Sequence, residues 1–314
     1  MNINKFSQLF FVKFPIIFPL IYGAILYTFP SFEKQLILLT ILILGETHFG
    51  ATWPFFLNKF NYSFIKEKKS EFIVIPAMII LLSIVGFFLI KNFFLLIFFI
   101  ANMFHVTRQS SGVCKLYTKD QIEYKFQATF IYLINIIFFF VAFFRFYTPV
   151  IEGDSIIFVN IVFLSILLLA SIIYIFKFKF TEKFLTFLTG CLIFYPACFL
   201  SNPVHVILMG VTMHYTQYLY LTRHVVISRN TQESNVPKEK NNYIYSFFSI
   251  IIIYSIIMTI LSSSGKMNDT IYQNLILIPI IGQILHFYID SQIWKFREKH
   301  NRENTLFHLK KIIN

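Results

Sequence analysis

Long apolar segments separated by short polar ones follow one another along almost the whole chain. A helix needs about 20 mainly apolar residues to cross the hydrocarbon core of a bilayer. By that measure the sequence predicts ten transmembrane helices, at 9–29, 36–57, 72–90, 93–114, 127–148, 156–176, 184–200, 203–226, 243–263 and 272–294. We therefore expect an all-α, polytopic integral membrane helical bundle, in which residues 1–314 form a single transmembrane domain.

Two longer polar segments stand out from this pattern. Residues 228–242 are rich in charged and turn-forming residues, which predicts a solvated loop. Residues 296–314 form a basic tail, and its two histidines, His300 and His308, are expected to be solvated.

The composition supports a membrane protein. The chain is 57% hydrophobic and only 13% charged, whereas soluble domains have about 25% charged residues. Its net charge of +12 is spread over short loops, where lysine and arginine act as topology signals. Because little of this basic surface is contiguous, we expect no nucleic-acid partner.

The basic residues also predict an orientation. They gather after the second, fourth, sixth, eighth and tenth predicted helices, and the alternate loops hold almost none. By the positive-inside rule, both termini and the two polar segments are cytoplasmic. We expect the location to be a bacterial inner membrane.

Four histidines lie inside four different predicted helices: His48, His105, His214 and His286. An ionisable side chain in hydrocarbon is costly and marks a functional site by default. All four helices run from outside to inside, and each histidine lies in the middle to cytoplasmic part of its helix. The sequence therefore predicts a metal site to which all four imidazoles contribute.

Two carboxylates accompany these histidines. Asp290 is four residues after His286 and shares its helical face, so it can ligate a metal or orient a ligand imidazole. Glu46 points away from the face that His48 and Thr52 share, and it is a candidate orienting group or general base. The alternatives are interfacial side chains that reach the lipid headgroups.

Three further polar side chains lie beside the histidines and are expected to line the pocket or stabilise bound oxygen: Gln109, Gln217 and Tyr218. Polar side chains in membranes also join helices through hydrogen bonds. That purely structural interpretation stays open for each of them.

Imidazole ligands suit iron, copper, zinc and nickel. Several neutral histidines with an apolar approach favour a mononuclear Fe(II) that activates O2 on an apolar substrate from the bilayer. Another transition metal, including zinc with an activated water, stays open.

Two short motifs resemble the Brp/Blh family of membrane-embedded β-carotene 15,15′-dioxygenases. They are Thr47-His48-Phe49-Gly50 and the stretch from Leu285 to Asp290, with His286 at its second position. The resemblance implies that His48, His286 and His214 are ligands of a non-haem Fe(II) that cleaves a polyene. The chain departs from the family in lacking its N-terminal HGxxD motif and in having Tyr218 where the family has a second histidine.

We therefore expect a metal-dependent oxygenase that acts on a carotenoid-like or other unsaturated lipid. One alternative is a di-iron lipid desaturase or hydroxylase, although the eight histidines lack the clusters that such sites need. Another is a transporter or proton-coupled carrier that uses a relay of buried residues, namely Glu46, Arg108, His214 and Asp290.

Overall fold

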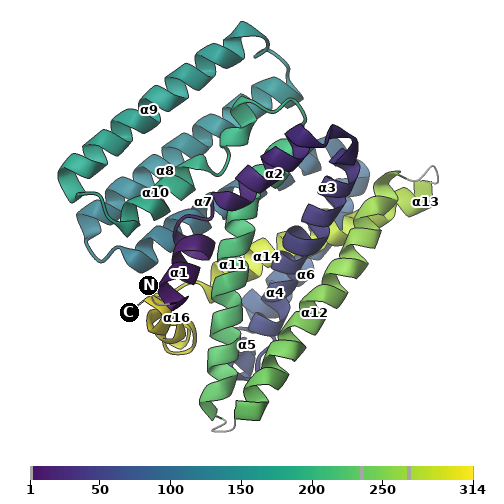
Figure 1. Ribbon diagram of the computed structural model, residues 1–314. Helices are drawn as coiled ribbons and strands as arrows, with labels where there is room; N and C mark the ends of the chain where they lie inside the picture. The colour runs from purple at the N-terminus through teal and green to yellow at the C-terminus, as the bar shows by residue number, and fades with distance from the viewer. Residues whose placement is uncertain (1–2, 234–236, 267–269, 314) are drawn as a thin grey trace. The chain divides into compact units, whose positions relative to one another are not determined.

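The computed structural model describes residues 3–233, 237–266 and 270–313. The described residues are predominantly helical and contain no strand (Figure 1). The chain forms two compact units, one of residues 1–40 and 103–217 and the other of residues 41–102 and 218–314. We describe each unit by itself.

The first unit contains the N-terminal helices, three central helices and parts of two long ones. Its elements are α1 (Ile3–Gln8), η1 (Leu9–Lys13), α2 (Ile17–Thr28), η2 (Pro30–Phe32), α3 (Glu33–Thr40), the later part of α7 (Lys91–Tyr117), α8 (Gln121–Ala142), η6 (Phe143–Tyr147), α9 (Asp154–Phe178), α10 (Glu182–Leu192), η7 (Tyr195–Cys198) and the first part of α11 (Pro203–Glu233).

Helices α8, α9 and α10 lie side by side in the first unit (Figure 1). The buried face of α8 repeats every three to four residues, as helical geometry requires, and includes Ile131, Ile134 and Phe138. At the start of this face, the buried carboxylate of Glu123 accepts hydrogen bonds from the Tyr174 hydroxyl at 2.6 Å and from Lys183 at 2.8 Å. Buried polar side chains thus also join the three helices.

The second unit contains the remaining parts of α7 and α11 and most of the other helices. Its elements are η3 (Ile41–Gly45), α4 (Glu46–Phe56), η4 (Lys59–Asn61), α5 (Tyr62–Glu67), η5 (Ser70–Val74), α6 (Ile75–Leu89), α12 (Pro237–Ser263), η8 (Ser264–Lys266), α13 (Thr270–Gln273), η9 (Asn274–Ile276), α14 (Leu277–Ile293), α15 (Lys299–Asn301), η10 (Arg302–Leu306) and α16 (Phe307–Ile313).

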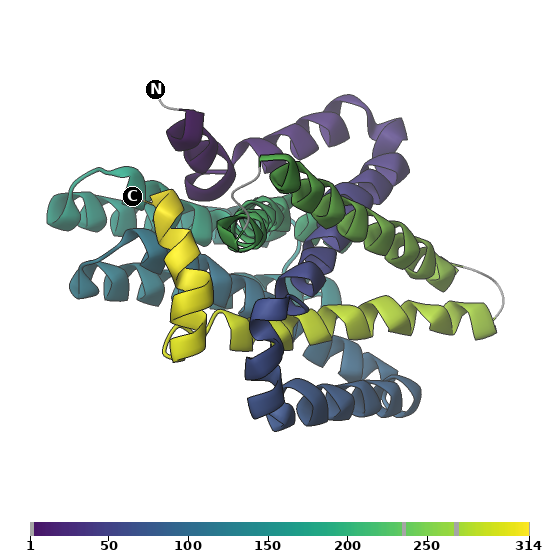
Figure 2. The ribbon, with the colours of Figure 1, turned by 90° about the horizontal axis from the view of Figure 1, so that it is seen from below.

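Helix α4 is central to the second unit because it packs against both α12 and α14 (Figure 1). Gly50 permits the close approach of α12, since a Cβ atom there would lie 2.9 Å from the ring of Tyr254. All seven residues from Glu46 to Thr52 are buried. After α14 the chain turns, and α16 runs at a steep angle to α14 (Figure 2).

Seven helical segments are long and apolar enough to cross a membrane, and an eighth candidate is a bent pair of helices. The seven are Pro30–Phe56, Ser70–Leu89, Lys91–Tyr117, Gln121–Tyr147, Asp154–Phe178, Asn242–Ser263 and Asn274–Ile293. Apolar side chains cover the outside of several of them, such as Leu168 of α9, which is 63% exposed. A soluble protein rarely exposes so much apolar surface, so the chain is an integral membrane protein with a helical bundle.

Three of the ten predicted spans differ from the structure. The first is two helices bent by 60°, because the ring of Pro15 keeps Phe14 out of the helical region. The seventh holds only the 11-residue helix α10 and a short 3-10 turn. The eighth lies in α11, which is 31 residues long. This helix is not one of the seven apolar segments, because polar side chains recur along it.

The two polar segments also differ from the prediction. Helix α11 continues to Glu233 and α12 begins at Pro237, so much of the expected loop 228–242 is helical. Residues 234–236 lie outside the described residues. The predicted tail folds back on its own unit, and His308 is only 5% exposed rather than solvated.

Candidate metal centre

Three helices of the second unit bring His48, His286 and Tyr218 together. The ring centroids of His48 and His286 are 4.5 Å apart, and those of His48 and Tyr218 are 4.6 Å apart. The ring centroids of Tyr218 and His286 are 5.2 Å apart. A ring nitrogen of His48 lies within 4.8 Å of one of His286. The side chains come from α4, α14 and α11, so the arrangement depends on tertiary packing.

Hydrogen bonds connect this cluster to a carboxylate. The Tyr218 hydroxyl donates to Asp290 Oδ1 at 2.7 Å. Thr52 Oγ1 lies 2.8 Å from the Tyr218 hydroxyl and 2.5 Å from His286 Nδ1. His286 Nε2 is 3.8 Å from Asp290 Oδ2, which is too long for a hydrogen bond.

These five side chains are almost completely shielded. Thr52 and His286 are 0% exposed, His48 1%, Asp290 2% and Tyr218 3%. Imidazole nitrogens are common ligands of transition metal ions. Two adjacent imidazoles and a nearby carboxylate make a donor set that suits iron, zinc or another transition metal ion. The residues present therefore fit a metal.

The first unit contains a second histidine pair. The rings of His105 and His214, on α7 and α11, are 5.6 Å apart and nearly perpendicular. Both histidines are buried. The structure therefore brings two of the four predicted ligands, His105 and His214, together within this unit.

The two predicted glutamines occupy different surroundings. The side-chain amide of Gln217 donates to the backbone carbonyl of Val12 at 2.7 Å. This hydrogen bond joins α11 to η1, so Gln217 has a structural role. Gln109 is partly exposed on α7.

Glu46 lies on the side of α4 that faces α12 and α14. It is 2% exposed, and its Oε1 accepts a 3.4 Å hydrogen bond from Gln283, three residues before His286. Its other oxygen has no hydrogen-bond partner among the described residues. Glu46 therefore contacts the helix that holds His286 through Gln283.

A further buried histidine, His205, lies near the start of α11. It is 3% exposed and bridges two side chains of the first unit. Its Nε2 lies 2.8 Å from Glu33 Oε1, and its Nδ1 lies 2.6 Å from the Tyr22 hydroxyl. No spacing in the sequence links these residues, which are on α3, α2 and α11.

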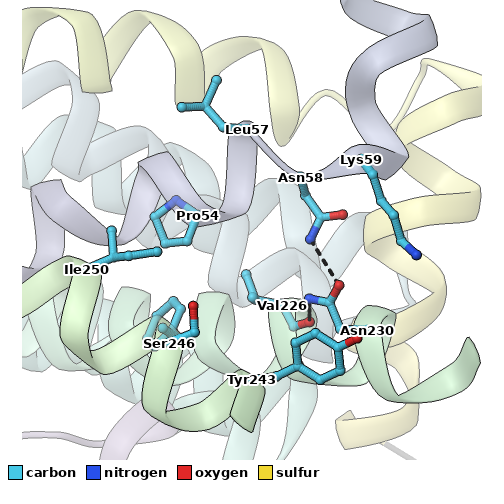
Figure 3. Close-up of a pocket in the computed structure, with 10 residues that line it drawn as sticks. Pro54, Leu57, Asn58, Lys59, Val226, Asn230, Tyr243, Ser246 and Ile250 are labelled. Atoms are coloured by element: carbon cyan, nitrogen blue, oxygen red, sulfur yellow. Dashed lines mark hydrogen bonds between the residues drawn. The ribbon is translucent and has the colours of Figure 1, made fainter. Parts of the chain in front are cut away.

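A small cavity of about 240 Å³ lies at the end of α4 in the second unit (Figure 3). Its wall is apolar at Pro54, Val226 and Ile250, and polar where Asn58 donates a 3.5 Å hydrogen bond to Asn230. None of the buried side chains of the His48–His286 cluster lines it.

Comparisons of the chain with protein-family models, with curated proteins and with solved structures returned no match.

Proposed function

We propose that this protein is a membrane-embedded non-haem iron oxygenase that acts on a carotenoid-like or other unsaturated lipid. The observation that carries the proposal is the buried group of His48, His286, Tyr218 and Asp290 inside a membrane protein. A ligand set of this kind is expensive to keep in an apolar interior unless it binds something. The resemblance of the motifs around His48 and His286 to the Brp/Blh family supports the same reaction class.

In this proposal, His48 and His286 bind a mononuclear Fe(II). The sequence-based expectation adds His105 and His214 as further ligands. When bound, the iron would supply the activation of dioxygen. The chain's own residues hold the ligand imidazoles in place and exclude water, since each is at least nine-tenths buried.

Asp290 and Tyr218 have distinct tasks at this site. Asp290 places a negative charge 3.8 Å from His286 Nε2, which stabilises a cation bound there. Tyr218 holds that carboxylate through its hydroxyl. Glu46 contacts α14 by accepting a hydrogen bond from Gln283.

The substrate would come from the bilayer, because the outer faces of the helices are apolar. We also propose that the protein resides in a bacterial inner membrane with both termini in the cytoplasm, as the distribution of lysine and arginine favours.

Metal analysis tests the proposal. Protein reconstituted anaerobically with Fe(II) in detergent should retain about one iron per chain, measured by inductively coupled plasma mass spectrometry. His48→Ala and His286→Ala should lose the iron, whereas His224→Ala, a partly exposed histidine on α11, should keep it. Full iron retention by both ligand variants would overturn the proposal. Two irons per chain would instead favour a di-iron desaturase or hydroxylase.

The same series tests the other two histidines. Iron loss in His105→Ala and His214→Ala would support four histidine ligands, and retention would restrict the ligands to the second unit. Expression in a β-carotene-producing host, with His286→Ala as the control, tests the substrate class. Loss of colour with the wild type alone is the expected result.

A further inference from the structure

The chain of hydrogen bonds from Asp290 to His286 has one consistent arrangement of protons. A carboxylate only accepts hydrogen bonds, so the Tyr218 hydroxyl gives its single proton to Asp290 Oδ1. In the 2.8 Å contact between Tyr218 and Thr52, the Thr52 hydroxyl must then be the donor. Since that hydroxyl also has only one proton, it is an acceptor in its 2.5 Å contact with His286 Nδ1.

This arrangement makes His286 Nδ1 a hydrogen-bond donor. Nδ1 carries a proton and donates it to Thr52 Oγ1, so the Thr52 hydroxyl holds the imidazole ring in one orientation. The other ring nitrogen, Nε2, lies 3.8 Å from Asp290 Oδ2.

We infer that Asp290 positions the imidazole of His286 through the hydroxyls of Tyr218 and Thr52. The inference rests on the proposed metal site. It makes Thr52 a positioning residue, and it replaces a direct hydrogen bond between Asp290 and His286, which their separation does not allow.

The residues of this hydrogen-bonded relay come from three helices. Thr52 is on α4, Tyr218 on α11, and His286 and Asp290 are on α14. Each link joins different helices, so the orientation of the His286 ring depends on correct packing of the second unit. Loss of such outer partners of a metal ligand costs about 10–100-fold in metal affinity.

The chain offers matched variants to test the relay. Thr52→Val removes the hydroxyl with little change of shape, and Thr52→Ser restores it. Thr47→Val is the control, because Thr47 is also buried on α4 but its hydroxyl donates to the backbone carbonyl of Ile43 in the adjoining η3. Tyr218→Phe breaks the link to Asp290, and Tyr220→Phe, on the same helix and partly buried, is its control.

The measurement is the affinity for Co(II), used as the probe metal, together with its visible absorption spectrum. Thr52→Val and Tyr218→Phe should bind Co(II) about 10-fold or more weakly than the wild type, with a changed spectrum. Thr52→Ser, Thr47→Val and Tyr220→Phe should resemble the wild type. Rescue by serine separates the lost hydroxyl from a packing defect.

The outcomes separate the relay from the proposed function. If the wild type binds Co(II) or Fe(II) and Thr52→Val and Tyr218→Phe bind it equally well, the relay is wrong and the metal site stands. If the wild type binds neither ion, the metal site is wrong and the relay with it.

Discussion

The hydroxyl of Tyr218 on α11 donates a 2.7 Å hydrogen bond to Asp290 on α14, and both side chains are at most 3% exposed. A buried phenol that loses its acceptor is left unsatisfied, at a cost of about 1–3 kcal/mol. Asp290→Ala should therefore lower the thermal unfolding midpoint of the metal-free protein in detergent. Asp290→Asn keeps an amide oxygen as acceptor, so it should lower the midpoint less. Equal losses in the two variants would contradict this role of the hydrogen bond.

The helices that could be predicted closely are those with uniformly apolar sequences. The predicted spans 72–90 and 156–176 match the helical segments Ser70–Leu89 and Asp154–Phe178 to within a few residues. The first span fails at a single local feature, the Phe14–Pro15 pair, whose effect depends on the backbone rather than on hydropathy. Average hydropathy detects length and polarity but not a bend.

The candidate site was predictable only where its members share a helix. The i,i+4 spacing of His48 and Thr52 places them on one face, and both side chains do contact His286. The link from Tyr218 to Asp290 joins residues 72 positions apart. Which helices become neighbours is decided by packing, so no pattern within one helix reveals that link.

Gly210 of α11 lies against the end of α10. A Cβ atom at this position would be 1.9 Å from the backbone carbonyl oxygen of Ile193, and a backbone atom cannot move aside as a flexible side chain can. Gly210→Ala should therefore destabilise the protein by about 1–3 kcal/mol or more. The measurement is the thermal unfolding midpoint in detergent.

Gly112 of α7 provides the control for Gly210, because a Cβ atom there would meet nothing within 4 Å. Alanine is a better helix former than glycine by about 1 kcal/mol, so Gly112→Ala should leave the midpoint unchanged or raise it. A similar loss in both variants would show that the close approach to Ile193 is not the cause.

His308 should make the stability of the folded protein depend on pH. Burial, together with the positive charges of Lys311, Arg229 and His224, lowers the pKa of its imidazole from 6.5 to about 4. Between these two values the unfolded chain binds a proton that the folded chain does not. The contribution of His308 to the free energy of unfolding is thus fully present above about pH 6.5, and it is lost as the pH falls towards 4.

The difference between His308→Asn and the wild type isolates this effect, because asparagine keeps a polar group for the 2.7 Å contact with Ser228 but does not titrate. We expect the unfolding midpoint of the wild type to fall more steeply than that of the variant between about pH 7 and pH 5. Parallel curves would contradict the lowered pKa.

His205 joins three helices of the first unit through its contacts with Glu33 and Tyr22. His205→Phe keeps an aromatic ring but leaves the buried Tyr22 hydroxyl without this partner, which should cost about 1–3 kcal/mol. Tyr22→Phe removes the hydroxyl itself. If the 2.6 Å contact is the cause, the double variant should be less destabilised than the sum of the two single variants. A double-mutant cycle of the unfolding free energies measures this difference, and additive losses would mean that the two side chains stabilise the protein independently.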